Sequence, residues 1–85
     1  MTFVDSVHAI VKKIPIGETL SYKEVAILAG SPRAYRAVGN ILNKNENPEI
    51  PCHRVVRSDG KAGGYNKGEA MKLEKLRAEK KLVRL

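Results

Sequence analysis

The chain has 85 residues, 42% of them hydrophobic and 29% charged, with a formal net charge of +7. This length suits one domain with a single modest core, and the recurrence of aliphatic residues excludes a disordered chain. No apolar run approaches the roughly 18 residues that span a membrane, and residues 1–5 lack the basic start and apolar run of a secretory signal.

The first third of the chain predicts two short helices with an extended segment between them. Apolar residues at helical spacing predict a helix over residues 2–13, which Pro15 ends, and an extended segment follows over residues 16–20. Ser21, with Glu24 three residues later, has the capping-box pattern that begins a helix. We expect this second helix to end before Gly30, because glycine commonly follows a helix C-terminus.

A further helix is expected over residues 32–43, because Ser31 suits an N-cap and Pro32 the first helical position. Two helices joined by a tight turn at Gly30 have the form of a helix-turn-helix, whose second helix enters a DNA groove. The alternative is an ordinary helical hairpin, which is common and binds no DNA. The candidate DNA-contacting residues combine small, polar and basic side chains: Arg33, Ala34, Tyr35, Arg36, Ala37, Gly39 and Asn40.

The second half of the chain predicts little regular structure before its last helix. Val55-Val56 predicts a short strand, and Asp59-Gly60 predicts the turn of a minor β-hairpin. A last helix is expected over residues 69–81. The predicted fold class is therefore mainly α: a small single domain over residues 1–85 with a helix-turn-helix, winged-helix-like, and a minor β-hairpin.

The positive charge is concentrated in this second half. Residues 1–51 carry six Lys or Arg against five Asp or Glu, whereas residues 52–85 carry ten against four. A basic face favours a polyanionic partner such as nucleic acid. The alternative is a lysine-rich helix that is simply solvated.

The single cysteine, Cys52, is followed by His53 and Arg54. Cations and hydrogen-bond donors favour the thiolate, which is the reactive form of cysteine. Adjacent side chains do not face each other, so His53 would act through a bridging water and would need a third group to orient it, for which Glu79 is a candidate. On these residues alone, an inert core cysteine remains the commoner alternative. One cysteine excludes a disulfide within the chain and fits a reducing intracellular compartment. One cysteine and two histidines are also too few for a structural zinc site, so we expect no metal.

The hexapeptide PCHRVV, residues 51–56, resembles the active-site motif of the O6-alkylguanine-DNA alkyltransferases, the methylated-DNA–protein-cysteine methyltransferases. The segment GETLSYKEVAILAGSPRAYRAVGNIL is similar to the helix-turn-helix of this family, and SDGKAGGYNKG is similar to its binding loop. The resemblance covers nearly the whole chain, as the DNA-binding and active-site domain, without the N-terminal domain that usually precedes it. Tyr35 departs from the family pattern, because it occupies a helix position that is often small.

Proteins of this family flip an alkylated guanine out of duplex DNA and move the alkyl group irreversibly to a cysteine, once per molecule. The resemblance implies that Cys52 accepts the alkyl group, that His53 takes its proton through water, and that Glu79 orients His53. Tyr22 would help to rotate the nucleotide, and Arg36 would fill the space left by the base. The residues that would form or brace the base pocket are Tyr65, Asn66, Val55, Lys72 and Asn45, with Asn43 or Asn47 as alternatives to Asn45.

The resemblance also implies the partners and the setting. The expected partner is double-stranded DNA that contains O6-alkylguanine, without a cofactor or a membrane, and the expected state is a monomer in the cytoplasm, associated with the nucleoid, or in the nucleus. A second hypothesis is an alkyltransferase-like sensor, which binds the lesion and recruits nucleotide excision repair proteins. The short chain favours the sensor, and Cys52 favours the transferase because sensors typically carry tryptophan there. A cysteine hydrolase is disfavoured because 85 residues leave little room for a substrate cleft.

Overall fold

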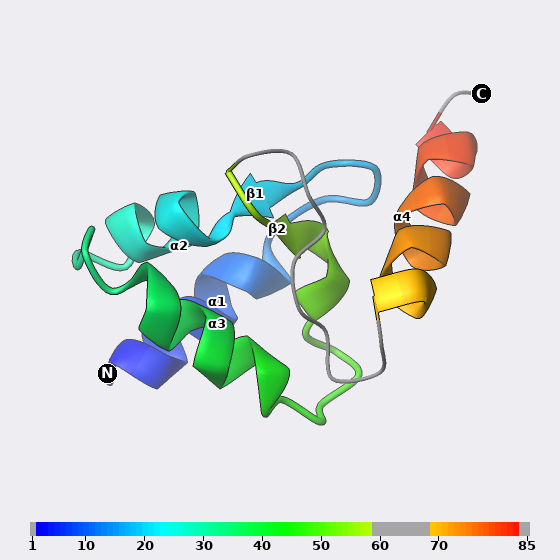
Figure 1. The fold of residues 1–85 in the computed structure, drawn as a ribbon. Helices are drawn as coiled ribbons and strands as arrows, with labels where there is room; N and C mark the ends of the chain where they lie inside the picture. The colour runs from blue at the N-terminus through cyan, green and yellow to red at the C-terminus, as the bar shows by residue number, and fades with distance from the viewer. Residues whose placement is uncertain (1, 59–68, 84–85) are drawn as a thin grey trace.

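The computed structural model describes residues 2–58 and 69–83, and in this part of the chain three helices form a compact cluster. They are α1 (Phe3–Lys12), α2 (Tyr22–Leu28) and α3 (Tyr35–Asn43), and each packs against the other two. Figure 1 shows the cluster in blue, cyan and green, with α2 and α3 joined by a short turn. The expected helix-turn-helix arrangement is therefore present, within a mainly helical fold.

Side-chain caps explain where two of these helices begin. Ser21 accepts a hydrogen bond from the backbone of Glu24 at 3.0 Å, and Glu24 accepts one from the backbone of Ser21 at 3.1 Å. Thr2 and Asp5 form the same reciprocal box at the start of α1. These contacts satisfy backbone donors that a helix leaves unpaired in its first turn.

The start of α3 differs from the sequence-based expectation by three residues. The helix begins at Tyr35 after the N-cap Ala34, which has no side chain able to cap it. The preceding residues form a turn in which the backbone of Ala34 donates to the carbonyl of Ser31 at 2.9 Å. The expected N-cap thus closes a turn before the helix.

The minor sheet has two strands, as expected, but they do not form a hairpin. Strand β1 (Leu20–Ser21) pairs in parallel with β2 (Val55–Val56), so Leu20 lies opposite Val55. A hairpin requires antiparallel neighbours joined by a short turn, and these strands are far apart in sequence. The Asp59-Gly60 turn that was predicted to follow β2 lies outside the described residues.

The core is built mainly from small aliphatic side chains, and it includes the cysteine. Its buried members are Val7, Val11, Ile14, Val25, Ala26, Val38, Leu42, Ile50, Cys52 and Val55. Each fully buried valine contributes about 1.5–3 kcal/mol relative to an exposed one. Because Ile50, Cys52 and Val55 belong to this core, the short segment between them is anchored to the helical cluster.

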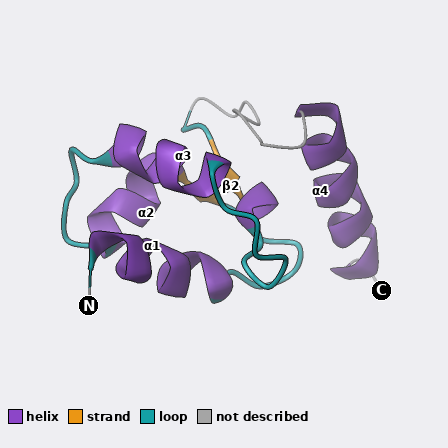
Figure 2. Ribbon diagram, turned by 90° about the horizontal axis from the view of Figure 1, so that it is seen from below, coloured by secondary structure: helices purple, strands orange, loops and turns teal. Residues whose placement is uncertain are grey.

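The last helix, α4 (Glu69–Val83), lies to one side of the helical cluster in both views (Figures 1 and 2). It packs against η1 (Cys52–Arg54), the single turn of 3-10 helix that carries the cysteine. The fold therefore brings η1 between the helical cluster and α4.

No helix in the described ranges combines the length and the apolar character that crossing a bilayer demands.

Candidate active site and nucleic-acid interface

The centre of the site is the η1 turn, where Cys52 and His53 are both buried, with 8% and 9% of their surface exposed. The turn is fixed by backbone hydrogen bonds from Cys52 to the carbonyl of Ile50 at 2.8 Å and from Arg54 to that of Pro51 at 2.9 Å. Pro51 has no N–H to donate, and its fixed φ suits the entry into a tight turn. The side chain of Cys52 therefore leaves this turn toward Asn45, whereas those of His53 and Arg54 leave it toward Glu79.

The sulfur of Cys52 is contacted by the side-chain amide of Asn45, whose Nδ2 donates to Sγ at 2.8 Å. The same Nδ2 donates to the carbonyl of Asn47 at 3.1 Å, and Oδ1 accepts from the backbone N–H of Asn47, also at 3.1 Å. This two-way contact fixes the orientation of the amide, so an N–H and not the carbonyl oxygen faces the sulfur. Such a donor stabilises negative charge on the atom that accepts it.

The sequence left Asn43, Asn45 and Asn47 as alternatives for the asparagine beside the active-site turn. In the structure, Asn45 is the one that contacts the sulfur. Asn47 instead braces the loop: besides its contacts with Asn45, its Oδ1 accepts from the backbone of Glu49 at 3.0 Å. Asn43 lies at the end of α3 and lines a different surface.

On the other side of η1, His53 and Arg54 both contact one carboxylate of α4. His53 Nε2 lies 2.8 Å from Oε2 of Glu79. Arg54 donates from Nε to Oε1 at 3.0 Å and from Nη2 to Oε2 at 2.7 Å, which is a two-pronged ion pair. Burial alone would raise the pKa of Glu79, but the hydrogen bonds from Arg54 and His53 outweigh it and hold this pKa below its ordinary value.

The ionised state of Glu79 determines the tautomer of His53. An ionised carboxylate can only accept hydrogen bonds, so Nε2 of His53 carries the hydrogen. Nδ1 is then the acceptor nitrogen of the neutral imidazole. A base directed at the thiol would therefore act through Nδ1.

A third cluster joins α2 to α4 through Tyr22 and Lys72. Lys72 is fully buried, donates from Nζ to the hydroxyl of Tyr22 at 3.1 Å, and lies 5.3 Å from the centre of its ring. Burial, and then the negative charge that Cys52 carries as a thiolate, raise the pKa of Tyr22. The phenol therefore stays protonated and lies within electrostatic range of the sulfur.

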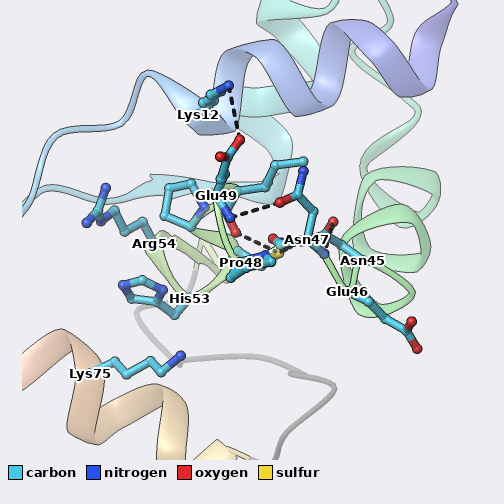
Figure 3. Close-up of a pocket in the computed structure, with 12 residues that line it drawn as sticks. Lys12, Asn45, Glu46, Asn47, Pro48, Glu49, His53, Arg54 and Lys75 are labelled. Carbon is cyan, nitrogen blue, oxygen red and sulfur yellow. Dashed lines mark hydrogen bonds and ion pairs between the residues drawn. The ribbon is translucent and has the colours of Figure 1, made fainter.

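Two of the hollows beside these groups border η1 and α3. One, of about 240 Å³, is bordered by Cys52, His53, Arg54, Asn45 and Lys75 together with the loop before Cys52 (Figure 3). The other, of about 370 Å³, lies along the exposed face of α3. Its lining residues are Tyr22, Tyr35, Arg36, Gly39, Asn40, Asn43 and Arg57.

The structure brings together most of the residues that the sequence singled out. Arg33, Tyr35, Arg36, Ala37 and Asn40 are all exposed at or along α3. Gly39 faces the ring of Tyr22 with room for a methyl group, because a Cβ built there would lie 3.9 Å from the nearest ring carbons.

One candidate for the base pocket, expected to act through its backbone carbonyl, has its side chain in the core, and two others fall outside the described residues. Val55 has a fully buried side chain, so only its backbone can face a ligand. Tyr65 and Asn66 lie outside the described residues. Two arginines, which the sequence offered only as cations near Cys52, have contacts that it did not predict: Arg57 lines the hollow along α3, and Arg54 binds Glu79. The concentration of positive charge after residue 51 was the signal available for both.

The chain is similar in sequence to proteins of one known family. Residues 2–81 match the family model described as "6-O-methylguanine DNA methyltransferase, DNA binding domain". A methylated-DNA–protein-cysteine methyltransferase of Methanosarcina barkeri is 49% identical over 85 residues, which cover 96% of this chain and 52% of the relative.

Two solved structures are also similar. The Mycobacterium tuberculosis protein OGT in complex with DNA matches with a TM-score of 0.89 and 40% identity, over 95% of this chain and 50% of that one. Atl1 of S. pombe, in complex with damaged DNA containing O6-carboxymethylguanine, matches with a TM-score of 0.83 and 30% identity, over 91% of this chain and 74% of that one. The chain thus spans about half the length of the methyltransferase relatives described here.

Proposed function

The chain belongs to the 6-O-methylguanine DNA methyltransferase family, as a DNA-binding domain of that family, and from this premise we propose that it transfers the alkyl group of an O6-alkylguanine to Cys52. The observation that carries the proposal is the environment of the sulfur. Cys52 accepts an N–H from Asn45 at 2.8 Å, and the adjacent residue, His53, is held by Glu79 at 2.8 Å. A core cysteine with no chemical role would need neither arrangement.

In the proposed reaction, the thiolate of Cys52 attacks the alkyl carbon of the lesion. A new S–C bond forms while the bond between that carbon and O6 breaks. The electron pair of the broken bond goes to the guanine, which takes up a proton from solvent and so becomes normal guanine. The thiol proton passes to Nδ1 of His53 through a water in the hollow that both residues line. Because no step restores the thiol, each molecule would react once. The thiolate is itself the acceptor, so the transfer needs no cofactor.

Negative charge develops on the guanine as the bond breaks, and a hydrogen-bond donor aimed at the base stabilises this charge. Tyr22 is the proposed donor. Its hydroxyl accepts from the ammonium of Lys72 at 3.1 Å, which favours donation of its own hydrogen to a bound base. Lys72 therefore helps to stabilise the charge on the guanine indirectly, through its hydrogen bond to Tyr22.

We propose that residues 1–85 bind duplex DNA through α3 and the groove beside it. A base inside a duplex cannot reach a buried thiol, so the alkylated nucleotide must be flipped out. Arg36 lines the groove next to Tyr22 and is exposed, so it is the proposed side chain that fills the space left in the DNA. Arg33, which precedes the helix and is exposed, suits a phosphate contact.

The test of transfer is the intact mass of the protein after incubation with a duplex that contains O6-methylguanine. The expected result is a gain of one methyl group, located on the Cys52 peptide, with guanine restored in the DNA. Cys52→Ser should bind the lesion without any gain in mass. If that variant gained the methyl group, Cys52 would not be the acceptor.

A second candidate function is a lesion sensor. The similarity of this chain to Atl1 of S. pombe favours it. The Atl1 structure was solved with DNA that carries an O6-alkylated guanine, and this chain covers 74% of it. Tight binding of the O6-methylguanine duplex with no change in protein mass would support the sensor over the transferase. Recruitment of excision repair proteins would then be the next property to test.

A further inference from the structure

Arg54 contacts the carboxylate of Glu79 on α4 and the backbone carbonyl of Ile14. We infer that Arg54 is a positioning residue, whose two hydrogen bonds hold the Glu79 carboxylate in the one orientation that engages Nε2 of His53. The inference rests on the proposed function for its meaning in catalysis. Its structural content concerns only the geometry of the three side chains and is testable without DNA.

Glu79 reaches the site from α4, which packs against η1 and lies to one side of the helical cluster. A carboxylate on such a helix has rotational freedom about its side-chain bonds, and one contact with an imidazole fixes only one oxygen. Arg54 contacts both: Nε binds Oε1 at 3.0 Å, and Nη2 binds Oε2 at 2.7 Å. Because the guanidinium is planar and binds both oxygens, it sets the plane of the carboxylate as well as its position.

Arg54 is itself fixed from a third direction. Its Nη1 donates to the carbonyl of Ile14 at 2.8 Å, directly after the end of α1. Ile14 belongs to the core, with 4% of its surface exposed. The guanidinium therefore connects the helical cluster to α4, and only 14% of its side chain is exposed. Through Arg54 and Ile14, the orientation of the Glu79 carboxylate is therefore tied to the same core that contains Cys52.

The same contact has an electrostatic consequence for His53. Oε2 of Glu79 accepts from both Arg54 and His53. While the carboxylate is ionised it can only accept, so Nε2 keeps the hydrogen and Nδ1 stays available. The titratable and charged groups that contact this carboxylate are His53 and Arg54 on η1, and Lys75 lies one turn earlier on α4. Among these contacts, the hydrogen bonds from Arg54 contribute most to the lowered pKa of Glu79, against the opposing effect of burial.

The test compares Arg54→Gln with Arg77→Gln in the full chain labelled with 13C and 15N. Both variants remove one positive charge, but Arg77 is exposed on α4 and serves as the matched control. The 13C shift of the Glu79 carboxyl carbon, followed against pH, gives its titration midpoint. The 15N shifts of the His53 ring give its tautomer at neutral pH, with His8 as an internal reference on α1.

We expect Arg54→Gln to raise the titration midpoint of Glu79 by about one pH unit, as the loss of an adjacent opposite charge does. We also expect the His53 ring to change from the Nε2–H tautomer to a mixture of both, whereas Arg77→Gln changes neither. An unchanged midpoint and tautomer in a folded Arg54→Gln protein would overturn the inference, as would an equal effect of Arg77→Gln.

Arg54→Lys keeps the charge without the two-pronged geometry, and it decides the matter if Arg54→Gln does not fold. The expected result is a Glu79 midpoint that remains low and a His53 ring that still shows mixed tautomers. A ring identical to that of the parent would overturn the role of the paired hydrogen bonds. Where the parent transfers methyl groups, Arg54→Gln should slow transfer by about tenfold, a part of the 10²–10⁴-fold that a general base supplies. If the parent transfers none, the transferase proposal fails while the two spectroscopic results still decide the role of Arg54.

Discussion

The side-chain amide of Asn45 and the sulfur of Cys52 lie 2.8 Å apart, across the loop that leads from α3 into η1. The contact joins the helix-turn-helix to the candidate nucleophile. Any change in the sulfur that removes its ability to accept this hydrogen bond would also remove one of the contacts that hold the loop. Reactivity at Cys52 and the conformation of residues 45–49 are therefore coupled through one amide group.

Replacing Asn45 with alanine removes the donor from the sulfur. A hydrogen bond to a charged group contributes about 1.5–3 kcal/mol, so we expect iodoacetamide to alkylate Cys52 at neutral pH at least tenfold more slowly in the variant. The measurement is the rate of mass gain under pseudo-first-order conditions. An unchanged rate would mean that the amide braces the loop without affecting the thiol.

Asn47→Ala is the matched control for this prediction. It removes the Oδ1 contact to the backbone of Glu49 but leaves the Asn45 amide beside the sulfur. We expect it to lower the free energy of unfolding by about 1 kcal/mol and to change the alkylation rate by less than Asn45→Ala does. Equal slowing in both variants would indicate that loop order alone controls the thiol.

Acid stability should depend on Glu79. Its pKa is lower in the folded chain than the ordinary value of 4.5, because the hydrogen bonds from Arg54 and His53 outweigh burial. A group of this kind adds stability above its unfolded pKa, and the added stability is lost as pH falls through the lower folded value. Relative to Glu79→Gln, the stability of the parent should therefore increase as the pH rises from the folded pKa of Glu79 through its ordinary value of 4.5.

Urea unfolding at a series of pH values measures this difference. The gap in the free energy of unfolding between the parent and Glu79→Gln should be widest above pH 4.5, the ordinary pKa of glutamate, and should shrink as the pH falls below it. A gap that stayed constant over the whole range would show that the charge of Glu79 contributes nothing through linkage, and that only packing differs between the two proteins.

The sequence predicted the local features of the fold because their causes are local. The Ser21–Glu24 capping box is confirmed by two backbone hydrogen bonds, since a cap depends only on residues three positions apart. The parallel pairing of Leu20 with Val55 was not predicted. Strands of two residues have no readable periodicity, and their pairing depends on how α2 and the η1 turn pack.

The site divides in the same way. The hexapeptide around Cys52 was recognisable because its residues are contiguous, and Glu79 was named only as a candidate because no sequence pattern brings α4 to η1. The two-pronged contact of Arg54 was missed for the same reason: it depends on the orientation of a distant carboxylate. Asn45 could not be separated from its neighbouring asparagines until the loop geometry was known.

Tyr22→Phe should destabilise the protein, although it removes one oxygen atom. The hydroxyl of Tyr22 accepts from Lys72, which is fully buried, and the variant leaves that ammonium without this acceptor. The loss of a hydrogen bond to a buried charged group predicts a decrease of about 1.5–3 kcal/mol in the free energy of unfolding. Urea denaturation at pH 7 gives the value.

Tyr35→Phe provides the comparison, because Tyr35 is 44% exposed on α3. Removing its hydroxyl should change the free energy of unfolding by no more than about 0.5 kcal/mol. Similar losses in the two variants would mean that the Lys72 contact is no stronger than a solvent-exposed one.

Two arginines at α3 should affect DNA in different ways. Arg36 lines the groove beside Tyr22, whereas Arg33 precedes the helix, and both side chains are exposed. If Arg36 offsets part of the few kcal/mol that flipping a base requires, Arg36→Ala should slow transfer from duplex DNA about tenfold. Its rate with free O6-benzylguanine should change little, because no base has to be flipped.

Arg33→Ala should instead weaken binding to all duplexes and reduce the slope of log affinity against log salt by about 1, as the loss of one phosphate contact does. Single-turnover rates with both substrates, and binding isotherms at several salt concentrations, separate the two effects. Equal slowing of Arg36→Ala with duplex and free base would remove Arg36 from the flipping step.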